Sequence, residues 1–327
     1  MSDMTQLKSR VMLRPTFQQQ WREYDYSQTN EKDIFLKLLH DLCGYIEEPV
    51  YRFGRPRLSL SDMLFSSALK VYSGFSLRRF MSDMKFVKEK DYINTVCSYS
   101  SISNYMRRED LTPILNHLIG LASQPLTTIE DKFAIDSSGF RTTKFNDYMR
   151  KRYEEEREHE WIKLHICCGV KSHIITAVEI NMHADTTQFI PLTMQTKENG
   201  FVIKEMTADK AYCAGSNYEY ISSIGGLPFI PFKSNVTGRS HGRGIIWRKM
   251  FRYFQLNRDE FMEHYHARSN VESTFNMIKS KFGDLVRSKD DIAQANELLL
   301  KVLCHNIVVL IHESLELGIE PDFIYRR

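Results

Sequence analysis

Three acidic residues have neighbours that indicate a shared chemical role: Asp136, Asp209 and Glu272. Asp136 and Asp209 each follow a short apolar run typical of a strand, and functional residues gather at such strand ends in open α/β sheets. A single aspartate after a strand is more often a turn or cap residue, and that alternative stays open for each one alone. Attack on a phosphodiester places negative charge on the attacking and leaving oxygens, which two divalent ions about 4 Å apart can stabilise. Magnesium prefers oxygen ligands, so three carboxylates are the cage expected for such ions.

The helical pattern around Glu272 carries further functional groups on one face. Tyr265, Arg268 and Lys279 lie at offsets that place all four side chains within an arc of roughly 60°. An apolar stripe beside this arc predicts the buried face of the helix: Ala267, Val271, Phe275, Ile278 and Phe282. An ordinary i,i+4 ion pair between Arg268 and Glu272 is the alternative explanation. The two upstream aspartates favour the functional interpretation.

A basic stretch between residues 233 and 258 directly precedes this helix. It contains seven cations and no acidic residue, and aromatic residues interleave with the cations in its second part. Like charges in one loop repel one another unless something neutralises them, and aromatic rings can stack on unpaired bases. The stretch therefore predicts a DNA-contacting loop, with a solvated loop over a small hydrophobic cluster as the alternative. The predicted DNA contacts in it are Arg239, Arg243, Arg248, Lys249 and Arg252.

The elements that would position these residues change in character near residue 130. Residues 1–30 predict an irregular arm, and residues 31–125 predict helices from their apolar spacing. Arg78-Arg79 and Arg107-Arg108 fall on short helices of that region, which fits either a helix-turn-helix DNA-binding unit or a plain bundle with a charged surface. Residues 130–317 predict three strands as a meander and then strands that alternate with helices, which is the ribonuclease-H-like order of an α/β domain. Residues 318–327 would be a C-terminal tail.

Bulk composition excludes several classes of protein. The 327 residues carry a formal net charge of only +3, so any nucleic-acid contact must use locally concentrated cations. The six cysteines form no C-x-x-C pair, which favours reduced thiols in a cytosolic protein over a disulfide framework. The N-terminus has no signal-peptide pattern, and the apolar stretch 298–311 is too short and too polar to span a membrane. The helix over residues 294–317 is expected to be core, although a dimer seam stays open.

The residues that carry this chemistry also resemble the motifs of a known family. Tyr265, Arg268, Glu272 and Lys279 resemble the tyrosine–arginine–glutamate–lysine signature of bacterial and archaeal insertion-sequence transposases with a DDE catalytic domain. The segments 134–138 and 207–212 resemble the family's two aspartate motifs, and Lys163-Leu164-His165 resembles the segment that enters its second strand. The resemblance covers roughly residues 130–312. One departure is Ala211, where such enzymes often have glycine.

The resemblance implies a ribonuclease-H-like domain in which Asp136, Asp209 and Glu272 bind two Mg²⁺ or Mn²⁺ ions. It implies cleavage at the ends of a mobile element and transfer of the freed 3′-hydroxyl into target DNA. Arg268 and Lys279 would then contact DNA phosphates, and Tyr265 would bond the backbone or support the glutamate helix.

The implied partners are double-stranded DNA, as terminal inverted repeats and target, and a second copy of the chain in a homodimer. No membrane partner is expected, and the expected location is the prokaryotic cytoplasm, at the nucleoid. Two alternatives stay open: a catalytically silent DNA-binding derivative of such an enzyme, and a metal-dependent nuclease that cuts without joining.

Overall fold

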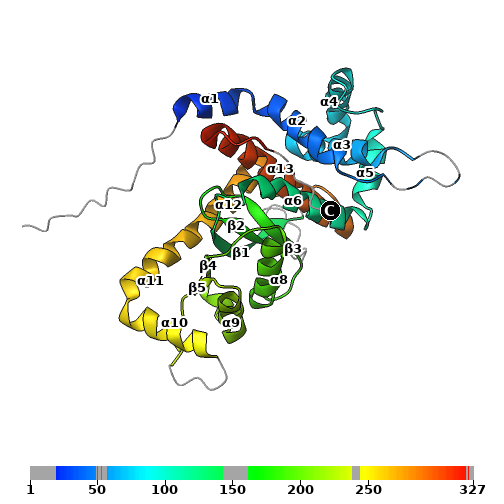
Figure 1. Cartoon of the computed structure of the whole chain (residues 1–327). Helices are drawn as coiled ribbons and strands as arrows, with labels where there is room; N and C mark the ends of the chain where they lie inside the picture. The colour runs from blue at the N-terminus through cyan, green and yellow to red at the C-terminus, as the bar shows by residue number, and fades with distance from the viewer. Residues whose placement is uncertain are drawn as a thin grey trace, which may run out of the picture.

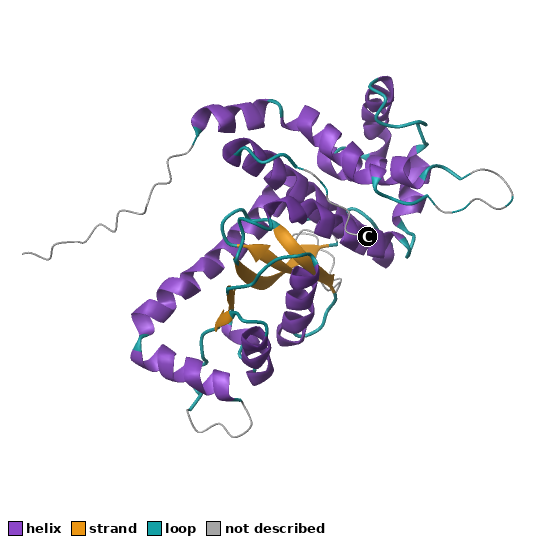
Figure 2. Cartoon of the chain, in the orientation of Figure 1, coloured by secondary structure: helices purple, strands orange, loops and turns teal. Residues whose placement is uncertain are grey.

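The computed structural model describes residues 20–48, 50, 53, 57–142, 161–237, 244–321 and 323. Helices surround one small sheet, and the N-terminal helices lie together on one side of it (Figure 1). Figure 2 shows the sheet enclosed by helices on both of its faces. The chain is therefore an α/β protein with a helical N-terminal region.

The sheet has five strands in the order β3-β2-β1-β4-β5. Its strands are β1 (Lys132–Arg141), β2 (Trp161–Gly169), β3 (Ile175–Ile180), β4 (Glu205–Ala208) and β5 (Leu227–Phe229). β1, β2 and β3 form an antiparallel meander, whereas β4 and β5 run parallel to β1. This mixed order confirms the ribonuclease-H-like architecture expected from the sequence.

Alternation along the strands gives the sheet two apolar faces, each covered by helices. One face packs under α8 (Asp185–Glu198), α9 (Gly215–Ser223) and α10 (Ile245–Leu256), and its cluster includes Phe133 and Ile135 of β1. The other face packs under α6 (Leu111–Ser123), α12 (Ser269–Phe282) and α13 (Asp291–Leu317), and its cluster includes Ala134 and Phe140. Successive β1 residues therefore face different helical layers.

The N-terminal helices share the second of these cores. They are α1 (Trp21–Thr29), α2 (Glu31–Gly44), α3 (Leu60–Ser73), α4 (Leu77–Glu89) and α5 (Tyr99–Met106). Buried residues of α2, α3 and α5 belong to the same cluster as those of α6 and α13, so one continuous core joins the N-terminal helices to the sheet. Ser59 caps α3 by accepting a hydrogen bond from the Asp62 amide at 3.4 Å, and Gly74 ends the helix with φ 66°.

The long helix α13 is the central element of that core. Every residue from Leu298 to Ile311 is buried, which confirms the expectation of a core helix. Its length and composition would suffice to cross a membrane, contrary to the sequence expectation, but 78% of its apolar window is buried inside the protein. The buried Lys301 ammonium donates to the carbonyls of Gly283 and Leu285 at 2.8 and 3.0 Å, so this charge secures the turn between α12 and α13.

Four sequence expectations need correction. Residues 21–29 form α1 rather than an irregular arm; the helix packs on α13, and the Ser27 hydroxyl lies 3.1 Å from His312 Nδ1. The helical pattern around Glu272 is not one continuous helix, because a 3₁₀ turn at His266–Arg268 separates Tyr265 from α12. Strand β1 continues past Asp136 because β2 pairs with it as far as Arg141. The second half of the basic stretch is α10 rather than loop, because apolar residues recur there at helical spacing.

Candidate active site

The register of the two central strands brings Asp136 and Asp209 to the same level of the sheet. The last parallel pair between β1 and β4 joins Ile135 to Ala208, and each aspartate is the next residue of its chain. At Asp209 the chain leaves the sheet, and the Asp209 carboxylate caps the following 3₁₀ turn by accepting from the Ala211 amide at 3.0 Å. The two carboxylates therefore lie beside each other at the edge where β4 ends.

Alternation in β1 sends consecutive side chains to different neighbours. Asp136 and Ser138 face the layer of α12: Asp136 contacts Arg268 in the 3₁₀ turn before that helix, and Ser138 contacts Lys279 of the helix itself. Ser137 faces the opposite layer and donates to Asp185 at the start of α8, at 2.8 Å. The Ser137 amide also donates to Asp136 Oδ1 at 2.8 Å, which fixes that carboxylate.

Glu272 comes from the first turn of α12. Val271, Phe275 and Ile278 are buried against the sheet, as the apolar stripe predicted, whereas Ala267 and Phe282 are only half-buried. The Glu272 side chain lies on the edge of that buried face and keeps 58% of its surface exposed. The preceding 3₁₀ turn leaves Tyr265, Arg268 and Glu272 on one side of the chain, where Arg268 donates hydrogen bonds to both of the other side chains.

Arg268 links the carboxylates. Its guanidinium lies 3.2 Å from Asp136 Oδ2 and donates to Glu272 Oε1 at 2.7 and 2.8 Å. Its Nε donates to the Tyr265 hydroxyl at 3.1 Å. The predicted i,i+4 pair with Glu272 is present, but the same guanidinium also reaches across to the sheet. A positive charge is therefore held between two of the three acidic residues.

Burial and the nearness of other carboxylates disfavour the ionised form of the acidic side chains at this site. Burial is the main cause that raises the pKa of Asp136, and the nearby Asp209 and Glu272 charges raise it further, while Arg268 and the Ser137 amide oppose the shift. Burial, with the same three carboxylates, also raises the pKa of the Tyr265 hydroxyl. The phenol is therefore a neutral donor at ordinary pH, and the carboxylates need a nearby positive charge.

Lys279 lies further along the same helix face. Its ammonium donates to Ser138 Oγ at 2.7 Å and lies 5.0 Å from the centroid of the Phe140 ring. Burial lowers its pKa. Its phosphate-contact role stays a prediction, because within the structure this lysine is bonded to the strand that carries Asp136.

A second polar group adjoins the site from the other face of β1, and the sequence analysis did not identify it. Asp185 accepts from Ser137 and Lys163, the latter at 2.6 Å, and lies 3.5 Å from His165 Nδ1. The Tyr212 hydroxyl is buried nearby, and Asp185 and Asp136 raise its pKa in addition to burial. Part of the signal was present in the resemblance of the 163–165 and 207–212 segments to family motifs, but no local pattern links Asp185 to them.

The basic stretch that precedes the helices around Glu272 divides into a buried and an exposed side. In α10, Trp247 and Phe254 are buried, and Trp247 stacks on Phe251 with ring centroids 5.5 Å apart. Trp247 and Phe254 are therefore unavailable for stacking on bases, and the hydrophobic-cluster alternative is correct for these two rings. Phe251 and Tyr253 are half-buried, and stacking of these rings on bases stays a prediction. The cations Arg248, Lys249 and Arg252 are exposed on the other side of the helix. Arg239 and Arg243 lie outside the described residues.

The donor set suits a hard divalent cation. Asp136, Asp209 and Glu272 offer only carboxylate oxygens, the ligands that Mg²⁺ and Mn²⁺ prefer. Within the described ranges, no three acidic, histidine or cysteine side chains are already gathered closely enough to hold a metal ion. The Arg268 guanidinium lies between Asp136 and Glu272. By donor chemistry the three carboxylates fit a divalent cation.

Comparison with known proteins found a family model that matches this chain. Residues 128–307, more than half of the chain, match the family model described as the transposase DDE domain. The match begins just before β1 and ends within α13, so it includes the sheet, both aspartates and the α12 segment. A search of curated proteins found no significant match.

Proposed function

Because the chain belongs to the transposase DDE domain family, we propose that it is a DNA transposase that cuts the ends of an insertion sequence and joins the freed strand to target DNA. The family's members act on DNA and in general use divalent metal ions. The observation that carries the proposal is that Asp136 and Asp209 lie at the same level of the parallel strand pair, while Arg268 contacts both Asp136 and Glu272.

The proposed roles follow from the contacts. Asp136, Asp209 and Glu272 would hold two Mg²⁺ or Mn²⁺ ions, which would stabilise charge on the attacking and leaving oxygens of the phosphodiester. The Ser137 amide orients the Asp136 carboxylate, and the 3₁₀ turn after Asp209 orients the second. These bonds would hold two of the proposed ligands in position before any DNA binds, and such preorganisation favours phosphoryl transfer.

Arg268 has two states in this proposal. In the first state, its guanidinium contacts Asp136 and Glu272, as in the structure, and neutralises these carboxylates when they have no other counter-charge. Once their charge is balanced otherwise, its planar fork can turn to a phosphate of the bound strand, a group that arginine binds in two-point geometry. Tyr265 holds the Nε end in both states, and Lys279 would supply a further phosphate contact.

DNA outside the reacting bond would lie on the exposed cations of α10, namely Arg248, Lys249 and Arg252, with Arg239 and Arg243 as further proposed contacts. The terminal repeats and the target would both be double-stranded DNA. A synaptic complex holds two element ends, so a homodimer is the proposed active form. The proposed location is the prokaryotic nucleoid.

The test is strand cleavage and joining by the purified protein on a labelled duplex from the DNA that flanks its gene. Cuts at the repeat boundary and joined products, both dependent on Mg²⁺ or Mn²⁺, would support a transposase. Metal-dependent cuts without joined products would instead support a nuclease. Binding without cleavage under either metal would support the catalytically silent DNA-binding derivative.

A further inference from the structure

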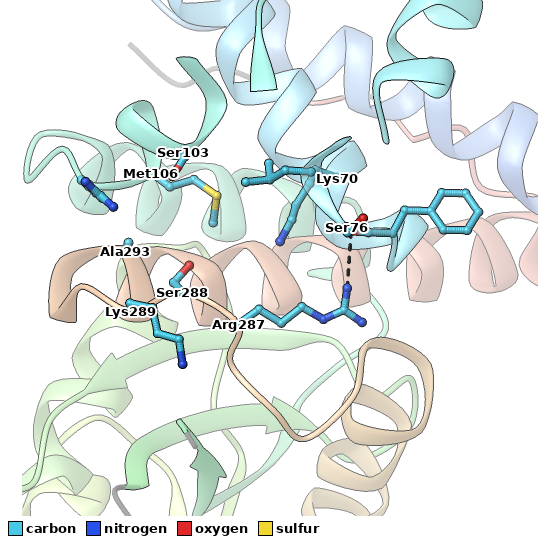
Figure 3. Close-up of a pocket in the computed structure, with 11 residues that line it drawn as sticks. Lys70, Ser76, Ser103, Met106, Arg287, Ser288, Lys289 and Ala293 are labelled. Carbon is cyan, nitrogen blue, oxygen red and sulfur yellow. Dashed lines mark hydrogen bonds between the residues drawn. The ribbon is translucent and has the colours of Figure 1, made fainter. Parts of the chain in front are cut away.

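A cavity of about 270 Å³ lies between the N-terminal helices and the segment that joins α12 to α13 (Figure 3). It is somewhat smaller than the roughly 300–1,000 Å³ typical of sites for whole small molecules. The described residues that line it include four cations and no acidic residue, and the cations are Lys70, Arg107, Arg287 and Lys289. The cavity is therefore of a size and charge for a single anionic group.

Lys70 is the most informative of these cations. The residue is only 6% exposed, and its side chain extends from α3 into the cavity (Figure 3). No hydrogen bond or ion pair joins its ammonium to any part of the chain that the structure describes. The nearest acid, Glu297, is bonded instead by the Arg287 amide at 3.0 Å and by the Ser288 amide and hydroxyl at 2.8 and 2.7 Å.

The Lys70 residue is largely buried, and its ammonium keeps donors that no described part of the chain uses, so a ligand in the cavity can accept from them. Burial lowers the pKa of Lys70, and the nearby Arg287 charge lowers it further, while the Glu297 charge raises it. An anion in the cavity would add to the Glu297 charge and oppose the effects of burial and of Arg287. The fold therefore holds a cation in a position that an incoming anion would stabilise.

The start of α4 lies on the same cavity. Ser76 and Leu77 line it, and the Ser76 side chain makes no capping bond to the helix. The first turn of this 13-residue helix contains no acidic residue. Its free backbone N–H groups and the helix dipole both favour a negative group at this end. Lys70 and the helix start are independent features that favour the same ligand chemistry.

We propose that this cavity binds a backbone phosphate of duplex DNA, with Lys70 at its base and Arg107 and Lys289 at its rim. The inference rests on the proposed function, because it takes DNA to be the substrate. Arg78 and Arg79, which follow Leu77 on the first turn of α4, are exposed as well. Several cations in and next to one site suit a polyanion better than an isolated phosphate ion.

The cavity is mechanically connected to the candidate active site. The Arg141 amide donates to the Asp284 carbonyl at 2.9 Å, and the Val286 amide donates to the Arg141 carbonyl at 2.8 Å. These bonds join the 284–289 segment to the end of β1, the strand that carries Asp136. A phosphate held in the cavity would therefore lie in a fixed relation to the carboxylates, which would position the duplex as well as bind it.

The test measures affinity of the full chain for a short mixed-sequence duplex at several salt concentrations. The variants are Lys70→Met, which keeps the apolar stem, and Lys289→Ala, whose side chain is exposed. Lys197→Met on α8 is the matched control, since it removes an exposed charge from the opposite layer of the sheet. Each lost phosphate contact should weaken binding about tenfold and reduce the slope of log K against log salt by about one.

The outcomes separate this site from the proposed function. Weaker binding and a smaller salt slope for Lys70→Met and Lys289→Ala, but not for Lys197→Met, would support the inference. Unchanged binding by Lys289→Ala and by a folded Lys70→Met would overturn it and leave the transposase proposal intact. If Lys70→Met unfolds, the Lys289→Ala result decides.

Inorganic phosphate distinguishes the two sources of the anion. Lys70-dependent stabilisation by phosphate in a thermal melt, with unchanged duplex affinity, would assign the cavity to a free anion and overturn the DNA inference. Failure of the wild-type protein to bind any duplex would instead contradict the proposed function itself.

Discussion

Replacing Arg268 by alanine tests whether this guanidinium serves as the counter-charge of the acidic site. The contact with Asp136 is largely buried, with 16% and 21% of the two side chains exposed, so its loss should cost about 1.5–3 kcal/mol. The contact with Glu272 is screened by solvent, because that side chain is 58% exposed, and it should contribute less than about 1 kcal/mol. We therefore expect a total loss of about 2 kcal/mol at pH 7, or roughly 3 °C in Tm for a chain of this length.

Divalent metal should reverse this loss. Without Arg268, the three carboxylates have no positive partner, so a cation would gain more by binding the variant than by binding the wild type. A ligand at about a hundred times its Kd stabilises by about 2.7 kcal/mol, which is enough to restore the variant. The assay is thermal unfolding with and without Mg²⁺, with Arg268→Lys as the charge-retaining control. Equal metal responses in wild type and variant would refute the reasoning.

The same variant gives a pH test with a defined sign. The pKa of Asp136 is raised by burial, and removal of Arg268 should raise it further. A carboxyl whose folded-state pKa is raised gives its stability contribution at low pH and loses it as pH rises through that value. The stability deficit of Arg268→Ala should therefore be largest at neutral pH and should narrow on acidification. A deficit that is independent of pH would show that packing, rather than charge, is the cause.

Three further predictions concern residues outside the acidic triad that support the fold or the site. Burial lowers the pKa of Lys301 to about 8, below its usual 10.5, so unfolding free energy should rise between pH 8 and 10.5 in the wild type, and this rise should be absent in Lys301→Met. Trp247→Ala should destabilise the chain by about 3–5 kcal/mol in a denaturant titration because the ring is fully buried, and a loss below about 1 kcal/mol would contradict its core role. Asp185→Asn should weaken the Ser137 contact and reduce cleavage about tenfold at saturating metal with DNA affinity unchanged, so that an equal loss of affinity would contradict a purely positioning role.

The strands of the sheet and the candidate acidic residues of the site could be identified from the sequence because both depend on local patterns. Alternating apolar runs located the strands, and the helical stripe of Val271, Phe275 and Ile278 correctly predicted the buried face of α12. The assignment of the acidic triad to catalysis stays a proposal. Its geometry agrees with the expectation that Asp136 and Asp209 lie at one edge of the sheet.

The features that the sequence could not give depend on contacts distant in the chain. The end of β1 was misplaced because only the pairing with β2 extends the strand beyond Asp136. The contact of Arg268 with Asp136 joins residues 132 positions apart, whereas its pair with Glu272 is local and was foreseen. The aromatic rings of α10 were assigned to DNA because their core partner Phe232 lies in a different segment.

The cationic cavity shows the same limitation of pattern-based inference. Lys70, Arg107 and Arg287 come from three separated segments, and none belongs to a motif. Lys70 in particular lies within an apolar helix, where sequence alone suggests a solvated edge. Only the packing of α3 on α13 shows that this ammonium is buried beside Glu297.

The most direct test of the central claim compares cleavage by Glu272→Gln with cleavage by the wild type, on the gene's own flanking duplex with Mg²⁺ or Mn²⁺. Glu263→Gln on α11 (Arg258–Tyr265) is the matched control, because it removes an exposed carboxylate from the same chain segment. Loss of a metal ligand worth about 4 kcal/mol in the transition state corresponds to roughly a thousandfold lower rate. We expect that loss in Glu272→Gln alone, with duplex affinity unchanged in both variants. Cleavage by Glu272→Gln at the wild-type rate would contradict the assignment of the acidic site.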